Sequence, residues 1–141
     1  MELDPKLVKK IKELKLKKSD EPQPDILVRI PNRNLDIEYL VRVESEEFTS
    51  LCPLHEDQPD FATITIRYIP NRWLAELKSL KLYLVSYRNV RIFHESVPAL
   101  ILKDLRTLLN PFQMLIVGEF TVRGGLYTTV TAHYKWLGSI E

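Results

Sequence analysis

The stretch FQMLIVGEFTVRGGLYTTVTAHY, residues 112–134, decides the fold. Its two parts, residues 112–122 and 126–134, read as β-strands, and Arg123-Gly124-Gly125 joins them. A glycine pair between two such runs is typical of a tight hairpin, because glycine adopts the positive φ that the turn requires. We therefore expect two antiparallel strands in this part of the chain.

The segments before this hairpin change from strand to helix patterns. Residues 36–43 and 61–69 alternate apolar and polar side chains, which predicts two more strands. Residues 79–89 and 97–109 carry apolar side chains at helical spacing, and Ser96 is a plausible cap for the second helix. The order strand, strand, helix, helix, strand, strand predicts an α+β fold, with one antiparallel four-stranded sheet and both helices on one face.

The N-terminal segment differs in character from the rest. Residues 5–18 predict a basic helix capped by Asp4, and residues 19–25 have the composition of a linker. We therefore divide the chain into an arm, residues 1–25, and a domain, residues 26–141. The lysines of the helix would contact RNA or lipid phosphates, or the helix is an arm that packs on a neighbouring subunit or is simply solvated. The residues favour the arm.

The composition limits the classes of function. The chain has 141 residues, 45% of them hydrophobic, and a formal net charge of +1, which suits a single domain without a global attraction to nucleic acid. Its four glycines form neither a dinucleotide-binding fingerprint nor a P-loop. No apolar run is long enough for a membrane span, and the first residues do not resemble a signal peptide, so we expect a cytoplasmic protein.

A loop with a cysteine at one end and a carboxylate at the other follows the first predicted strand. Cys52 and Asp60 are these ends, and Pro53 and Pro59 lie beside them. Cys52 is the one cysteine of the chain. A thiolate is a strong nucleophile, and a nearby acid could supply or remove a proton. Proline and aspartate are also common in turns. The residues by themselves leave a nucleophile and a structural turn equally open.

Three further features each have a chemical and a structural interpretation. Lys78 and Lys81 would share a helix face that binds an anion such as phosphate, although two solvated lysines are the favoured interpretation from the residues alone. Glu95 would accept hydrogen bonds from a guanine-like base, or is an ordinary acid at a helix start. Arg123 is a phosphate ligand or a hairpin residue.

In combination, these segments resemble the QueF family, the NADPH-dependent 7-cyano-7-deazaguanine reductases. The stretch ELKSLKLY, residues 76–83, is similar to the family signature of Glu, Ser or Leu, Lys, Ser or Ala, a hydrophobic residue, Lys, any residue and an aromatic. The loop at residues 48–62 resembles the nucleophile loop, and residues 93–95 and 120–125 resemble later segments. The aspartate usually comes seven residues after the cysteine in this family, whereas Asp60 is eight after Cys52.

The resemblance implies a role for each candidate residue. Cys52 would attack the nitrile carbon and form a covalent thioimide, with Asp60 as general acid and His94 assisting or orienting. Glu95 and Phe93 would bind the base. NADPH would deliver hydride twice, and the product would enter queuosine synthesis for transfer RNA. The expected ligands of the cofactor are Lys78, Ser79, Lys81 and Arg123.

The resemblance also implies a tunnelling fold (T-fold), in which sheets of several subunits close into a barrel with sites between subunits. We therefore expect a homo-oligomer based on pentamers, such as a decamer, with no metal and no direct contact to nucleic acid. Two alternatives remain. One is an archaeosine-type, QueF-like amidinotransferase that acts on the nitrile in transfer RNA, a branch that lacks the motif at residues 76–83. The other is a non-catalytic, ring-forming binding protein.

Overall fold

Four long strands form the centre of the molecule, in a computed structural model that describes residues 2–55 and 57–140. Met1, Glu56 and Glu141 lie outside these residues. Glu56 belongs to the loop between Cys52 and Asp60, which is one residue longer than the loop of the family that the sequence resembles. The strands pair antiparallel in the order β2-β3-β5-β6. Their bounds are Val41–Leu51, Pro59–Ile69, Gln113–Arg123 and Leu126–Tyr134. The hairpin predicted at residues 112–134 is confirmed.

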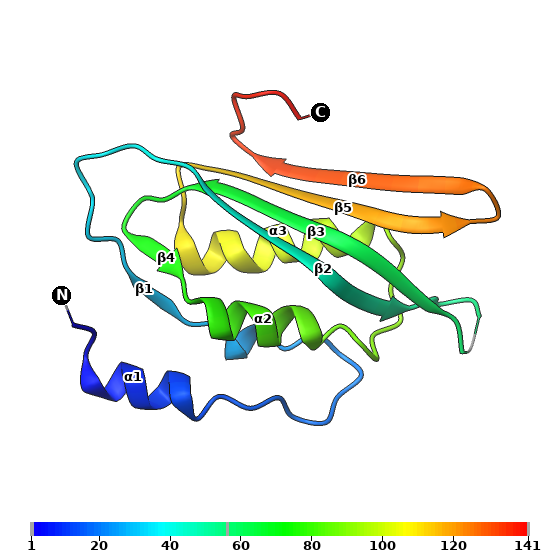
Figure 1. Cartoon of the computed structure of the whole chain (residues 1–141), viewed down its shortest axis with the longest axis horizontal. Helices are drawn as coiled ribbons and strands as arrows, with labels where there is room; N and C mark the ends of the chain where they lie inside the picture. Colours follow the sequence, from blue (N-terminus) through cyan, green and yellow to red (C-terminus); the bar gives the residue numbers. More distant parts are fainter. Residues whose placement is uncertain (1, 56, 141) are drawn as a thin grey trace.

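The helices lie on one side of this sheet (Figure 1). They are α1 (Pro5–Lys12), α2 (Leu77–Val85) and α3 (Ser96–Leu109). After α1 the chain forms a 3₁₀ turn at Pro24–Ile26. It then enters β1 (Arg29–Pro31), which pairs with β4 (Trp73–Ala75) in a two-stranded sheet. The predicted α+β class, the four-stranded antiparallel sheet and the two helices on one face agree with this arrangement. No helix in the described part of the chain is long and apolar enough to cross a membrane.

The core lies between the sheet and the two long helices. Ile64 and Ile66 of β3 and Ile116 of β5 are 0–1% exposed on the face that meets the helices. Ile101 and Leu105 of α3 pack against them and are fully buried. Each such side chain contributes about 1.5–3 kcal/mol through removal from water. This apolar layer fixes the positions of the strand ends, where the candidate site residues Cys52, Asp60 and Arg123 lie.

The first predicted strand is wrong in its bounds. Residues 36–40 lie outside any strand, and β2 runs from Val41 to Leu51. The register with β3 shifts between Ser45 and Phe48, which marks a bulge. A bulge breaks the two-residue alternation of side chains, so the second half of β2 could not be recognised from the pattern. Tyr39 instead donates a hydrogen bond to Asn32 Oδ1, 2.6 Å away.

Three predictions about the helices also need correction. The first helix ends at Lys12 and not at residue 18, and Asp4 caps it as predicted, with Oδ1 2.9 Å from Lys6 N. Ser96 is the first residue of α3 and not its cap, because Glu95 occupies the N-cap position without a side-chain hydrogen bond. The helix predicted at residues 79–89 is α2, which begins at Leu77 and ends at Val85. The Glu76 carboxylate caps α2 by accepting hydrogen bonds from Lys78 N at 2.8 Å and Ser79 N at 2.7 Å.

Candidate active site

A short extended segment after α2 brings the later motif to the end of β2. Leu51 N donates to Val90 O at 2.9 Å, and Ile92 N donates to Leu51 O at 3.1 Å. These two bonds form a parallel bridge between Leu51 and Arg91. Arg91 Nη1 also donates to Cys52 O at 3.2 Å. The bridge therefore places His94 and Glu95, which follow it, next to Cys52.

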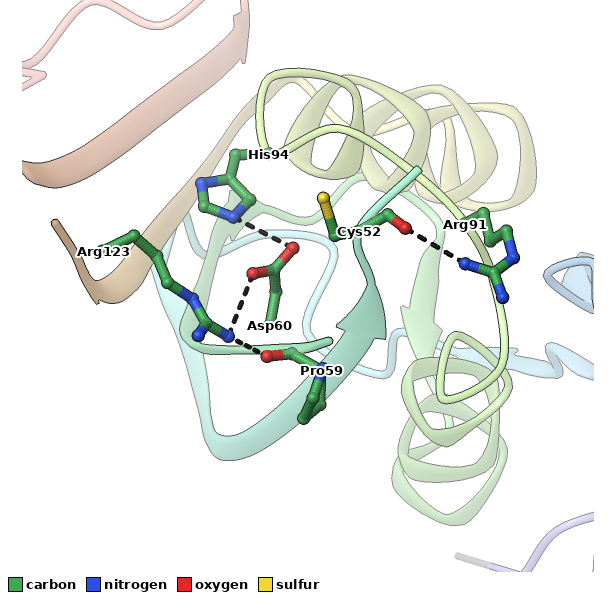
Figure 2. A network of polar contacts seen from close by, with 6 residues as sticks. All are labelled: Cys52, Pro59, Asp60, Arg91, His94 and Arg123. Carbon is green, nitrogen blue, oxygen red and sulfur yellow. Dashed lines mark hydrogen bonds and ion pairs between the residues drawn. The ribbon is translucent and has the colours of Figure 1, made fainter. Parts of the chain in front are cut away.

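Asp60 is the centre of the polar contacts at this end of the sheet. It is the second residue of β3 and is 4% exposed. Its Oδ2 lies 3.3 Å from His94 Nε2, and its Oδ1 lies 3.3 Å from Arg123 Nη2 (Figure 2). Arg123 also donates to the carbonyl oxygen of Pro59. A buried carboxylate requires such partners, because an unpaired charge away from water is costly.

The imidazole of His94 is held on a second side by an aromatic ring. His94 and Phe120 stack with ring centroids 3.9 Å apart and an angle of 6° between the planes. Stacking fixes the plane of the imidazole, and Asp60 fixes the direction of Nε2 within that plane. The contacts with Asp60 and Phe120 therefore hold the imidazole of His94 in one orientation.

These side chains line one pocket of about 190 Å³. Its walls are formed by Cys52, Pro53, Gln58, Asp60, Ile92, Phe93, His94, Glu95 and Arg123. The pocket therefore unites the predicted nucleophile, acid, histidine and base-binding residues, which come from three separate parts of the sequence. Figure 2 shows Cys52, Asp60 and His94 around the same space. In the described residues, no three His, Cys, Asp or Glu side chains are grouped as metal ligands.

The residues expected to hold the cofactor are not brought together within one subunit. Arg123 lines the pocket beside Cys52, whereas Lys78, Ser79 and Lys81 lie on α2. Lys78 Nζ donates to the carbonyl oxygens of Ile11 and Lys12, each at 3.0 Å.

Ser79 and Lys81, the two other expected cofactor ligands on α2, differ in accessibility. Ser79 is fully buried, and its hydroxyl accepts from Val28 N at 3.0 Å and donates to Glu76 O at 2.9 Å. Lys81 is exposed and lines a groove of about 620 Å³ between β2 and α2, together with Arg88. Contact of these residues with a cofactor stays a prediction.

Three residues near the site were not predicted to act there. Phe120 was part of a segment that resembles the family, and its apolar position in a strand indicated no more than a core residue. Arg91 gave no sequence signal. Ser50 lies opposite Asp60 in the pairing of β2 with β3. The sequence did not indicate this pairing, because the strand that it predicted ends at residue 43.

Comparisons with known proteins identify the family of this chain. A family model described as QueF-like protein matches residues 59–137. An NADPH-dependent 7-cyano-7-deazaguanine reductase of Thermomicrobium roseum is 52% identical over 109 residues, which cover 77% of this chain and 84% of the relative. An enzyme of the same name from Nitrosococcus oceani is 47% identical over 116 residues, which cover 77% of this chain and 89% of the relative.

A solved structure shares the fold. It is the archaeosine synthase QueF-Like in the apo form, with a TM-score of 0.64 and 23% identity, covering 70% of this chain and 96% of that one. At this identity the likeness concerns the fold alone. The matched model spans more than half of the chain, and the relatives are similar over most of it. The protein therefore belongs to the QueF-like family.

Proposed function

We propose that this protein reduces the nitrile of 7-cyano-7-deazaguanine to an aminomethyl group with NADPH. The observation that carries the proposal is the single pocket that contains Cys52, Asp60, His94 and Glu95. A thiol, a carboxylate and an imidazole in one small space are the groups that nucleophilic attack and proton transfer require. The names of relatives that are about half identical to this chain support the same reaction.

The first step forms a covalent bond to Cys52. The thiolate adds to the nitrile carbon, and one bond of the C≡N group becomes the lone pair of the imide nitrogen. Asp60 takes the thiol proton and passes it to that nitrogen, so that a neutral thioimide results. His94, 3.3 Å from the Asp60 carboxylate, orients this group and relays protons in the following steps.

Glu95 and Phe93 bind the base in this proposal. A carboxylate accepts two hydrogen bonds, which fits the adjacent N–H groups of a guanine-like ring. Glu95 lines the pocket at the N-terminus of α3, where the helix dipole favours a negative charge. Phe93 also lines the pocket, and 51% of its surface is exposed, so its ring is free to stack on a planar base. Glu95→Ala is therefore expected to weaken substrate binding.

The positive charges on and after α2, the helix that carries the signature at residues 76–83, fit the phosphates of a nicotinamide cofactor. Lys81 and Arg88 are seven residues apart, and both line the groove between β2 and α2. Their charges match phosphate groups, and the Lys78 ammonium lies at the start of the same helix. Bound NADPH supplies hydride. The nitrile takes up four electrons in all, so each base requires two NADPH and two protons.

We also propose that subunits assemble through the open edges of the sheet, in the T-fold manner of a homo-oligomer based on pentamers. β2 and β6 are the edge strands, and unpaired edge groups favour pairing with another strand. At the start of β6, Leu126 is 72% exposed and Tyr127 is 81% exposed. Large apolar side chains at a strand edge are typical of an interface.

The test is NADPH oxidation measured with and without 7-cyano-7-deazaguanine, with Cys52→Ala as the control. Two NADPH consumed for each base, and none by the variant, is the expected result. A covalent adduct on Cys52 in mass spectra without NADPH oxidation would replace the reductase by an amidine-forming enzyme. A protein that shows neither signal would be a binding protein.

A further inference from the structure

Ser50 carries a hydroxyl group that has no partner in a fully buried position. The residue lies on β2, two positions before Cys52, and is 0% exposed. Its Oγ makes no hydrogen bond. Among the described residues, the other buried side-chain atoms without a partner are two arginine Nε atoms, so Ser50 is the one hydroxyl in this condition. The buried hydroxyls of Ser79 and Ser86 are both bonded.

An unpaired buried hydroxyl is expensive, because it has lost its bonds to water without replacement. Such groups are rare in folded proteins, and a catalytic role is one of the reasons for which they are kept. Alanine would fill nearly the same space at Ser50 without this cost. The position of the hydroxyl therefore needs a reason beyond packing.

The strand register supplies a partner. Ser50 is directly opposite Asp60 in the pairing of β2 with β3. Side chains of directly opposite residues project from the same face, with Cβ atoms about 4.5–5.5 Å apart. The Asp60 carboxylate makes two contacts, each 3.3 Å long, to His94 and Arg123. A carboxylate has about four acceptor sites, so Asp60 retains capacity for a further donor.

We propose that Ser50 is a positioning residue for Asp60 and holds this side chain in both of its protonation states. The proposal rests on the proton transfer through Asp60 described above. While Asp60 is a carboxylate, the Ser50 hydroxyl turns about its Cα–Cβ bond and donates to it. After Asp60 has taken the thiol proton, the same hydroxyl accepts from the carboxylic acid. One rotating hydroxyl thus keeps the acid aimed at the substrate nitrogen as the proton arrives and leaves.

A hydroxyl that donates to the carboxylate favours its charged form. Loss of this donor would make Asp60 easier to protonate, so the acidic limb of the kcat/KM profile would move to higher pH. The other titratable or charged groups around Asp60 act on it in both the wild type and the variant, and they are His94, Arg123, Cys52 and Glu95.

The experiment compares Ser50→Ala with the wild type in the full-length protein. We expect Tm to fall by no more than about 5 °C, since the variant loses one hydrogen bond to Asp60 and little packing. We expect kcat to fall roughly tenfold, with little change in KM for the base, and the acidic limb to move to higher pH. A loss of turnover with a shifted pH profile, in a variant that stays folded, is an outcome that a purely structural serine would not produce.

Ser50→Thr and Ser50→Val form a matched pair, because their side chains have nearly the same shape and differ in the hydroxyl. Any strain from the larger side chain affects both. Higher turnover of the threonine variant, with the wild-type pH profile, is expected. Ser86→Ala is the control for hydroxyl loss elsewhere: it loses bonds to Gln23 N and Tyr83 O, so Tm should fall while kcat and the pH profile stay unchanged.

A substrate-free measurement separates this inference from the proposed function. The rate of Cys52 alkylation by iodoacetamide, recorded against pH, reports on the charge of Asp60 without any nitrile or NADPH. A shifted curve for Ser50→Ala supports the inference even if the protein reduces no nitrile. If the wild type reduces the nitrile and Ser50→Ala has the same turnover, pH profile and alkylation curve, the inference is wrong and the proposed function stands.

Discussion

The imidazole of His94 lies flat on the ring of Phe120, with 3.9 Å between the ring centroids and 6° between the planes. Phe120 comes from β5, and His94 comes from the segment before α3. The contact therefore joins the sheet to the helical layer directly at the pocket that contains Cys52. Phe120 is 4% exposed, so its ring acts as a rigid support for the imidazole.

Replacement of this support should affect turnover more than binding. Phe120→Leu leaves an apolar side chain but removes the flat surface, so the His94 ring loses its fixed plane. We expect kcat to fall roughly tenfold, since small misplacements of a reacting group are costly, and the free energy of unfolding to fall by about 1–1.5 kcal/mol. Phe48→Leu is the matched control, because Phe48 is 2% exposed and packs on Tyr87, with 5.3 Å between centroids. An equal loss of kcat in both variants would contradict a specific role for Phe120.

Gly118 permits the close approach of α3 to β5. A Cβ atom at this position would lie 3.0 Å from Pro98 Cγ and 3.0 Å from Phe120 Cε2. Gly118→Ala should therefore destabilise the fold by about 1–3 kcal/mol, because the proline ring and the packed core cannot move away freely. Chemical denaturation measures the change. Stability equal to that of the wild type would show that α3 adjusts without cost.

Lys78 and Lys81 should differ in one measurable respect. Lys78 holds the C-terminal carbonyl oxygens of α1, whereas Lys81 lines the groove beside β2. We expect Lys78→Gln to release α1, which has no fully buried residue, and hydrogen exchange in residues 5–12 should become faster. Lys81→Gln should leave this exchange unchanged. Both variants should raise KM for NADPH if the two ammonium groups bind its phosphates.

Hydrogen exchange of the wild type with and without NADPH tests whether α1 and the cofactor compete for Lys78. If bound NADPH takes Lys78 from the carbonyl oxygens of α1, addition of NADPH to the wild type should also speed exchange in residues 5–12. Slower exchange would instead show that the arm and the cofactor bind together.

Asp104 should make the stability depend on pH. Tyr83 donates to Asp104 Oδ2 at 2.6 Å, so Tyr87, 2.8 Å from Tyr83, donates in turn to the Tyr83 oxygen. Burial raises the pKa of Asp104 above its ordinary value of 3.8, although the Tyr83 hydrogen bond opposes the rise. The folded state therefore binds the proton more readily than the unfolded state, and stability falls as pH rises from 3.8 through the raised pKa.

Asp104→Asn removes this titration and keeps an oxygen that accepts from Tyr83. The free energy of unfolding of the variant relative to the wild type should increase with pH across that interval and be constant above it. Urea titrations of both proteins at several pH values measure the difference. A difference that does not change with pH would show that Asp104 titrates alike in the folded and unfolded chains.

Much of the architecture could be predicted from local patterns. The hairpin at residues 112–134 and the helix over residues 97–109 were found because glycine turns and helical spacing are properties of neighbouring residues. The second half of β2 was not found, since its bulge interrupts the alternation. The short pair β1 and β4 has three residues in each strand, too few for a pattern.

The sequence by itself determined the antiparallel α+β class and the identity of the chemical groups, because periodicity and motifs are written in adjacent residues. Only the tertiary structure decided which groups meet. Cys52, Asp60 and His94 become neighbours because β2 pairs with β3 and the segment after α2 bonds to Leu51. The opposition of Ser50 and Asp60 depends on strand register, and the stacking of His94 on Phe120 depends on how α3 packs on β5. Such contacts arise from long-range packing and pairing, which no local pattern specifies.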